Sequence, residues 1–223
     1  MLQHKLIFCA AVLANSAVFA QSSGSFAATI DSTQCTVSTS GTNGKTITSI
    51  TTTIQTPSSG STALLITPSA VTGLYTDSVV TVTNPDTTAT GAVVASVKFD
   101  GAPVKPSADT GFTDSSGKPL YGIVYDSRSQ ELSTNIFTAL AAACSSSNNC
   151  FIDLKQGTMS AHSMNFVVPN PNANGSNNHT LEVDFSLVPG TMTSNGAAAC
   201  VGPGTLTVQQ VKTFQTSGGI AFQ

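Results

Sequence analysis

The feature that most constrains the fold is a succession of short segments rich in valine, isoleucine and threonine. In Thr180–Leu187 the apolar residues Leu181, Val183 and Phe185 alternate with polar ones. Such alternation predicts a half-buried antiparallel strand. Valine, isoleucine and threonine also favour strands because branched side chains pack well on a pleated surface. The other predicted strands are Phe26–Ile30, Thr46–Thr56, Ala63–Thr67, Val79–Thr83, Ala92–Phe99, Leu120–Tyr125, Phe151–Leu154, Met159–Val168 and Thr205–Phe214.

Turn signals separate these segments. Pro57–Gly60 and Asn84–Asp86 carry the proline, glycine and asparagine typical of turns. Asp100-Gly101 suits a type I′ hairpin turn, in which both central residues need a positive φ. The polar, glycine-containing stretch Pro106–Pro119 predicts a long surface loop.

One segment has helical rather than strand spacing. Leu132, Ile136 and Leu140 recur every four residues, and Ser127 and Gln130 precede them at capping-box spacing. We expect an amphipathic helix over Gln130–Ala143 that covers an edge or end of a sheet. The predicted fold is therefore all-β: an antiparallel β-sandwich, jelly-roll-like, with one short amphipathic helix near residues 130–143.

The first twenty residues predict where the protein goes. His4 and Lys5 precede an apolar run, and Val18-Phe19-Ala20 before Gln21 fits the pattern of a signal-peptide cleavage site. We expect a signal peptide over residues 1–20 and a single secreted domain over residues 21–223. The protein would not span a membrane after cleavage. An extracellular location is favoured, with the cell surface or a periplasm as open alternatives.

Four cysteines remain after residue 20, and an even number in an exported chain favours disulfides. We predict the pairs Cys144–Cys150 and Cys35–Cys200. The first pair brackets a short polar bridge after the predicted helix, and the second joins the first and last strands. A zinc site is disfavoured because no two cysteines stand at C-x-x-C spacing and the mature chain has only His162 and His179. No cofactor or metal is expected.

The charge balance excludes one large class of partners. Charged residues make up 9% of the chain, the net charge is −3, and Arg128 is the only arginine. Nucleic-acid binding relies on clustered Lys and Arg, so we do not expect it. The expected partner is an unknown extracellular ligand or surface.

Candidate catalytic residues are few. No serine lies in a G-x-S-x-G nucleophile elbow. Glu182 and Asp184 share a predicted strand face about 6–7 Å apart, a spacing compatible with paired carboxylates. The chain has no tryptophan to stack on sugar rings, so a solvated strand face is the simpler reading. His162 and Arg128 complete this alternative site. Arg128 is more simply expected to form a structural ion pair, with a neighbour such as Asp126, or to tie the start of the predicted helix to a nearby loop.

Two functions follow from these observations. We expect a non-enzymatic extracellular protein with a structural, adhesive or surface-binding role. A variant would bind a regular surface through a threonine row that includes Thr46, Thr48, Thr51 and Thr53. The alternative is a secreted polysaccharide-acting hydrolase or lyase on the same scaffold. Asn174 and Asn178 both begin N-glycosylation sequons.

Overall fold

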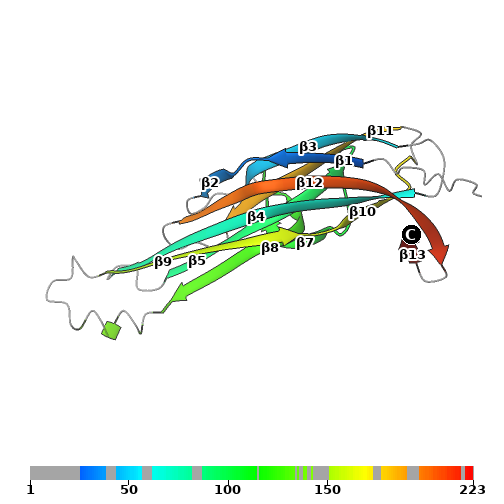
Figure 1. The fold of residues 1–223 in the computed structure, drawn as a ribbon. Coiled ribbons are helices and arrows are strands. Elements are labelled where there is room, and N and C mark those ends of the chain that lie inside the picture. The colour runs from blue at the N-terminus through cyan, green and yellow to red at the C-terminus, as the bar shows by residue number, and fades with distance from the viewer. Residues whose placement is uncertain are drawn as a thin grey trace, which may run out of the picture.

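The computed structural model contains two antiparallel sheets packed face to face (Figure 1). It describes residues 26–38, 44–56, 62–81, 87–114, 116–133, 135, 138–139, 142, 151–172, 177–189, 196–216 and 219–222. The first sheet contains β1 (Phe26–Asp31), β2 (Gln34–Ser38), β4 (Thr62–Thr81), β9 (Phe151–Ser163), β10 (Phe166–Pro169), β12 (Gly196–Thr216) and β13 (Gly219–Phe222). The second contains β3 (Lys45–Gln55), β5 (Thr87–Phe99), β6 (Ala102–Pro103), β7 (Ala108–Thr113), β8 (Pro119–Leu132) and β11 (Asn178–Pro189).

The strand pairs are nested along the chain. β1 and β2 pair with β12, β3 pairs with β11, β4 pairs with β9 and β10, and β5 pairs with β8. The first strands therefore pair with the last long one, and each following pair lies inside the previous one. The resulting orders, β1/β2-β12-β4-β9/β10 and β3-β11-β5-β8, are those of a jelly roll. This confirms the predicted β-sandwich.

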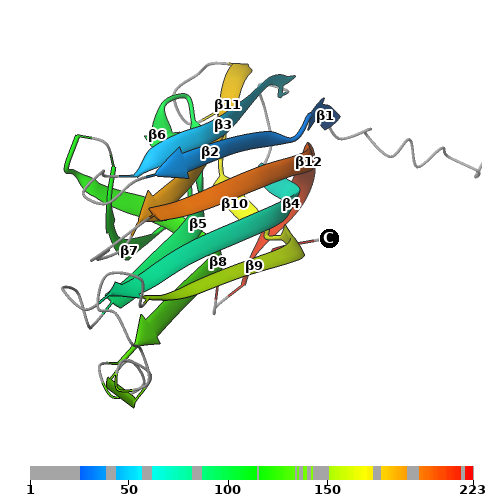
Figure 2. The ribbon, with the colours of Figure 1, turned by 90° about the vertical axis from the view of Figure 1, so that its left-hand side faces the viewer.

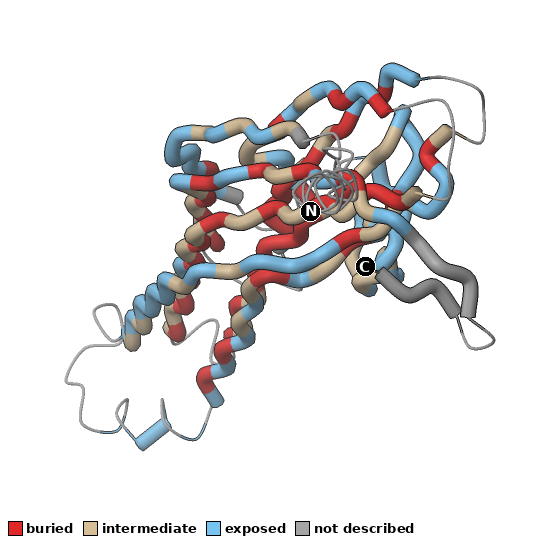
Figure 3. The backbone as a smooth tube through the Cα atoms, turned by 45° about the vertical axis from the view of Figure 1, so that its right-hand side comes forward, coloured by how far each residue is buried: buried red, intermediate tan, exposed pale blue. Residues whose placement is uncertain are grey.

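The core lies between the sheets, where buried residues alternate along the strands (Figure 3). Phe166 and Phe185 are fully buried in it. The phenol of Tyr125, on β8, donates a hydrogen bond of 2.9 Å to the Pro68 carbonyl on β4 and so links the two sheets. Burial raises the pKa of Tyr125, which keeps the phenol a neutral donor.

The two central strands of the first sheet, β4 and β12, each contain a proline at the point where one neighbouring edge strand ends and the next begins. Pro68 of β4 lies between the partner residues Ser163 of β9 and Phe166 of β10, and the Met164 amide donates to its carbonyl. The missing proline N–H points to the same side, into this break, where no ladder bond requires it. In β12 the register shifts between Val201 and Gly204, where the partner changes from β2 to β1.

Gly202 is required at that second break. Its φ is 113°, and a Cβ there would lie 2.7 Å from the Ser32 carbonyl oxygen. A larger residue would both strain the backbone and collide with the chain between β1 and β2.

The predicted type I′ turn is confirmed. Asp100 and Gly101 have φ values of 49° and 81°, and they connect β5 to β6. Two other expectations are corrected. Ala63–Thr67 and Val79–Thr83 were expected as separate strands, but β4 runs unbroken from Thr62 to Thr81. The expected loop Pro106–Pro119 contains β7, which pairs with β8.

The predicted helix begins later than expected. Gln130–Leu132 belongs to β8, because Leu132 is paired with Thr87 and packs against Val80. Asn135, Thr138 and Ala139 are helical and exposed, and the Ala142 amide donates to the Thr138 carbonyl. The rest of the predicted helix lies outside the described residues.

The predicted disulfide between Cys35 and Cys200 is confirmed. The two residues are directly opposite each other in the β2–β12 ladder, with Cα atoms 4.0 Å apart. The predicted pair Cys144–Cys150 lies outside the described residues, as does the predicted signal peptide. The described part of the chain contains no helix with the length and apolar character that crossing a membrane requires.

Candidate functional site

The most connected polar side chain is His179, at the start of β11. Its ring is 1% exposed and stacks on Phe99 with 4.6 Å between ring centroids. Nδ1 lies 2.7 Å from Oδ2 of Asp100, and Nε2 lies 3.0 Å from Oδ1 of Asn172. The Thr56 hydroxyl also donates to Asn172 Oδ1. One imidazole therefore joins the β5–β6 turn, the segment after β10 and the start of β11.

The partners of His179 determine where its proton lies. The Asp100 carboxylate only accepts, so Nδ1 carries a proton. The atom that faces Nε2 is Oδ1 of Asn172, the same oxygen that accepts from the Thr56 hydroxyl. Asp100 also accepts a 2.8 Å hydrogen bond from the Thr180 amide. Both nitrogens are used in packing the sandwich end, and the ring is too buried to reach a substrate.

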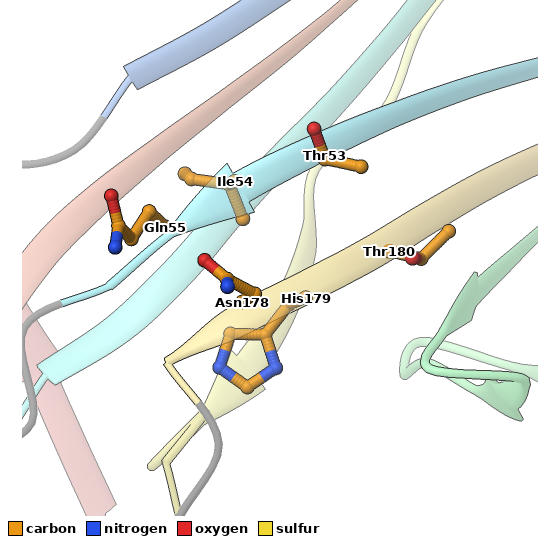
Figure 4. Close-up of a pocket in the computed structure, with 6 residues that line it drawn as sticks. All are labelled: Thr53, Ile54, Gln55, Asn178, His179 and Thr180. Atoms are coloured by element: carbon orange, nitrogen blue, oxygen red, sulfur yellow. The ribbon is translucent and has the colours of Figure 1, made fainter.

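An open hollow lies beside this cluster (Figure 4). It is lined by the ends of β3 and β11: Thr53, Ile54, Gln55, Asn178, His179 and Thr180. Asn178 is exposed at the start of β11, and its sequon residue Thr180 is exposed too. Asn174 lies outside the described residues. The described residues that line the hollow offer neutral hydroxyl, amide and aliphatic groups beside the edge of one ring, and none of them is a carboxylate.

Glu182 and Asp184 project from the outer side of β11. Lys98 of β5 bridges them, with Nζ 2.7 Å from Asp184 Oδ2 and 3.3 Å from Glu182 Oε1. The hydrogen bond to Asp184 raises the pKa of Lys98 against the opposing effect of burial. The two carboxylates therefore share one counter-ion on a sheet surface, where a structural ion triad accounts for both.

His162 lies on the opposite sheet, on the inward side of β9. Its Nε2 is 2.6 Å from the Ser160 hydroxyl, and its ring lies against Tyr125 with 5.6 Å between centroids. A hydroxyl and an imidazole in contact form part of a catalytic triad, but a triad also needs an acid that orients the ring. Among the described residues, the nearby carboxylate of Asp126 instead accepts from Thr158, at 3.3 Å.

Arg128 does not form the expected ion pair in the described part of the chain. A register shift near Tyr125 changes which residues of β8 face inward, so that Asp126, Arg128 and Gln130 all point between the sheets. Gln130 accepts from Thr76 and donates to the Leu154 carbonyl. Nη1 of Arg128 is buried without a hydrogen-bond partner among the described residues.

The structure thus separates the residues of the alternative site. Glu182 and Asp184 lie outside the second sheet, while His162 and Arg128 lie between the sheets on β9 and β8. Among the described residues, no three His, Cys, Asp or Glu side chains are placed to hold a metal ion.

The surface that sequence reasoning missed is the outer side of the first sheet. Outward residues there form transverse rows across β1/β2, β12, β4 and β9, with no charged side chain among them. We call this surface the uncharged face, and it consists of the rows Val37–Ala198–Tyr75–Gly157, Cys35–Cys200–Gly73–Met159, Val71–Ala161, Ile30–Thr205–Ser69–Ser163 and Ala28–Thr207–Thr67.

Charged groups mark one end of the uncharged face. In the next row, Asp77 of β4 is directly opposite Lys155 of β9. The side chain of Lys155 forms an ion pair with Asp153. Burial and the neighbouring Asp153 raise the pKa of Asp77, while the Lys155 ammonium holds the pKa of Asp153 below its usual value. The charges are therefore concentrated beyond Tyr75 and absent from the rows before it.

Comparisons with known proteins add little to this geometry. No protein-family model matches the chain, and no curated protein matches it. Among solved structures it is similar to a chain of the T13 particle of infectious bursal disease virus, at 12% identity over 83% of this chain and 34% of the viral chain, with a TM-score of 0.25. It is also similar to the Gx strain of that virus, at 11% identity over 83% and 37% of the two chains, with a TM-score of 0.25.

This chain spans about a third of the length of those viral chains. At such TM-scores the likeness carries no argument about function. The strand order, the disulfide and the surfaces define the class of protein instead: a disulfide-bonded jelly-roll β-sandwich.

Proposed function

We propose that this protein is an exported, non-enzymatic module with a structural or adhesive role, and that it acts through the uncharged face. The proposal rests on one observation. The uncharged face of the first sheet has large exposed apolar side chains and contains no charged residue. Met159 and Ile30 are 81% and 79% exposed there. The cores of protein interfaces are depleted in charged residues, and exposed apolar groups gathered on one uncharged sheet surface favour an interaction site.

Export is supported by the Cys35–Cys200 disulfide, since disulfides form and persist in oxidising compartments. Glycans on Asn174 and Asn178 and a second disulfide, Cys144–Cys150, belong to the same proposal. Asn178 lies on the second sheet, so a glycan there would leave the uncharged face open.

The proposal contrasts with a hydrolase or lyase that uses Glu182 and Asp184. Those carboxylates share Lys98 on the outside of the other sheet. A catalytic pair flanks a bound sugar from two sides, whereas both carboxylates here contact the same Lys98 ammonium.

The test compares matched surface variants in the producing cells. Met159→Lys places a charge on the uncharged face, and Thr51→Lys places the same charge on exposed β3 of the second sheet. We expect Met159→Lys to change how much protein is retained at the cell surface or in extracellular assemblies, while Thr51→Lys behaves as wild type. Equal retention of both variants would contradict the proposal, as would loss of a hydrolytic activity in Glu182→Gln or Asp184→Asn.

A further inference from the structure

The uncharged face is broad and open in the described part of the chain. Figure 2 shows β1/β2, β12, β4 and β9 side by side across the near side of the molecule. Val37 on β2 is 67% exposed, at the opposite edge from Met159. Large apolar groups thus lie at both edges of the face, with Ser69, Thr205 and the disulfide between them.

We propose that the uncharged face is covered by a second copy of this chain, in a symmetric dimer stacked sheet on sheet. This inference rests on the proposed function and names the partner of the same surface. In a two-fold dimer both copies offer the same patch to each other. A patch with charge of one sign would therefore meet its own charge.

The distribution of charge singles out this face for self-association. The chain carries a net charge of −3, so two copies repel each other overall. The second sheet presents Glu182, Asp184 and Lys98 on its outer side. On the uncharged face no ionised side chain has to lose water when two copies meet, so the largest cost of burying a surface is avoided.

The size of the face agrees with what a dimer needs. Nine residues along β4, from Thr67 to Tyr75, at about 3.4 Å each and four strands at about 4.8 Å each give a patch on the order of 600 Å². Two such patches bury about 1,200 Å², which is the lower end of the range for specific interfaces. Sheets stack face to face in this way inside β-sandwiches, about 10 Å apart.

Sedimentation equilibrium of the purified, oxidised chain tests the inference. We expect the wild type to fit a monomer–dimer equilibrium. Met159→Lys and Ile30→Lys should each weaken the dimer by at least about tenfold, because a charge at an apolar anchor acts like loss of a hot spot. Thr51→Lys adds the same charge to the second sheet and should leave the dimer unchanged. All three positions are exposed, so the variants are expected to fold.

Other outcomes would overturn the inference. A wild type that stays monomeric at every concentration would contradict it, and so would a Thr51→Lys variant that dissociates as much as Met159→Lys. If the purified protein is monomeric but Met159→Lys loses retention in producing cells, the second-copy inference fails and the proposed function stands. If neither measurement responds to Met159→Lys, both fail.

Discussion

The two sheets are built from the same strand-forming residue types, but their outer faces differ in charge and in cover. The outer face of the second sheet carries the Lys98–Asp184–Glu182 triad. Part of it is also covered, since Ala92 and Val94 are fully buried although they alternate with the core residues Val93 and Ala95. Among the described residues, the uncharged face of the first sheet has neither charges nor such cover.

A connection between strands crosses to the far edge of the second sheet. The end of β7, which pairs with β8 at one edge, reaches the start of β3 at the other, where the Gly44 amide donates to the Thr113 carbonyl at 3.1 Å. Val188, an outward residue of β11, is buried beside Gly44. The comparison teaches that part of one outer surface is buried within the chain, whereas the other is the surface on which the proposed partner would lie.

The largest effect is expected from removing the disulfide of the first sheet. The double change Cys35→Ser and Cys200→Ser opens a loop of 165 residues. Chain-entropy arithmetic gives a loss of up to about 5 kcal/mol in the free energy of unfolding, measured by urea denaturation. Hydrogen exchange should rise more in β2 and β12 than in β3 and β11. A loss below about 1 kcal/mol would show that the disulfide does not hold this sheet together.

The next largest effect is expected at one end of the second sheet, where β11 begins. His179→Ala removes a buried ring, its stacking on Phe99 and two hydrogen bonds, one of them to Asp100. We expect a loss of about 3 kcal/mol, from the cavity and the unpaired partners together. The matched control is His162→Ala on β9, where a half-buried ring should cost about 1 kcal/mol. Equal losses of unfolding free energy for the two histidines would contradict the role of His179 in joining the segments around it.

A smaller effect is expected from the charged outer face. Lys98→Met should destabilise by less than about 1 kcal/mol at neutral pH, because the ion pairs are partly exposed. The folded-state pKa of Lys98 is raised above 10.5, so its contribution is fully present below that pH and is lost as the pH rises through the folded value. Chemical denaturation from pH 7 to pH 12 should show the two proteins converging at the alkaline end. A difference that stays constant across this range would contradict the triad.

The smallest effect is expected from Asp77, in the charged row next to the uncharged face. The pKa of Asp77 is raised above 3.8 in the folded protein, so the native state binds its proton more tightly than the unfolded state. That stabilisation is present at low pH and is lost as the pH rises through the folded value. Asp77→Asn should therefore stabilise by a few tenths of a kcal/mol at pH 7 and give no gain near pH 3. Because Asp153 is a neighbour, the transition belongs to the pair. A loss of stability at pH 7 would contradict this description.

Local sequence patterns predicted much of the architecture. Period-two alternation located β11, and the Asp100-Gly101 pair located the β5–β6 turn, because both depend only on neighbouring residues. The Cys35–Cys200 disulfide followed from the argument that the first and last strands pair. The continuous β4 was missed, because only its two ends, Ala63–Thr67 and Val79–Thr83, were predicted as strands. Pro68 is tolerated within it because its missing N–H points into the gap between β9 and β10.

The sites were less predictable because they depend on register and topology. The register shift near Tyr125 turns Arg128 inward, which no periodicity in that segment indicates. The partners of His179 come from Asp100 and Asn172, which are close only once β5, β10 and β11 are placed. The uncharged face combines residues from five strands, so it is invisible in any single segment.

The most direct test of the account is side-chain oxidation of Met159 relative to Met164. In the isolated chain Met159 is 81% exposed and Met164 is 41% exposed, so dilute protein should oxidise faster at Met159. In concentrated protein, and in protein on the producing cells, we predict that the order reverses because the uncharged face is covered. Faster oxidation of Met159 under all three conditions would contradict the claim that this face is the working surface of the protein.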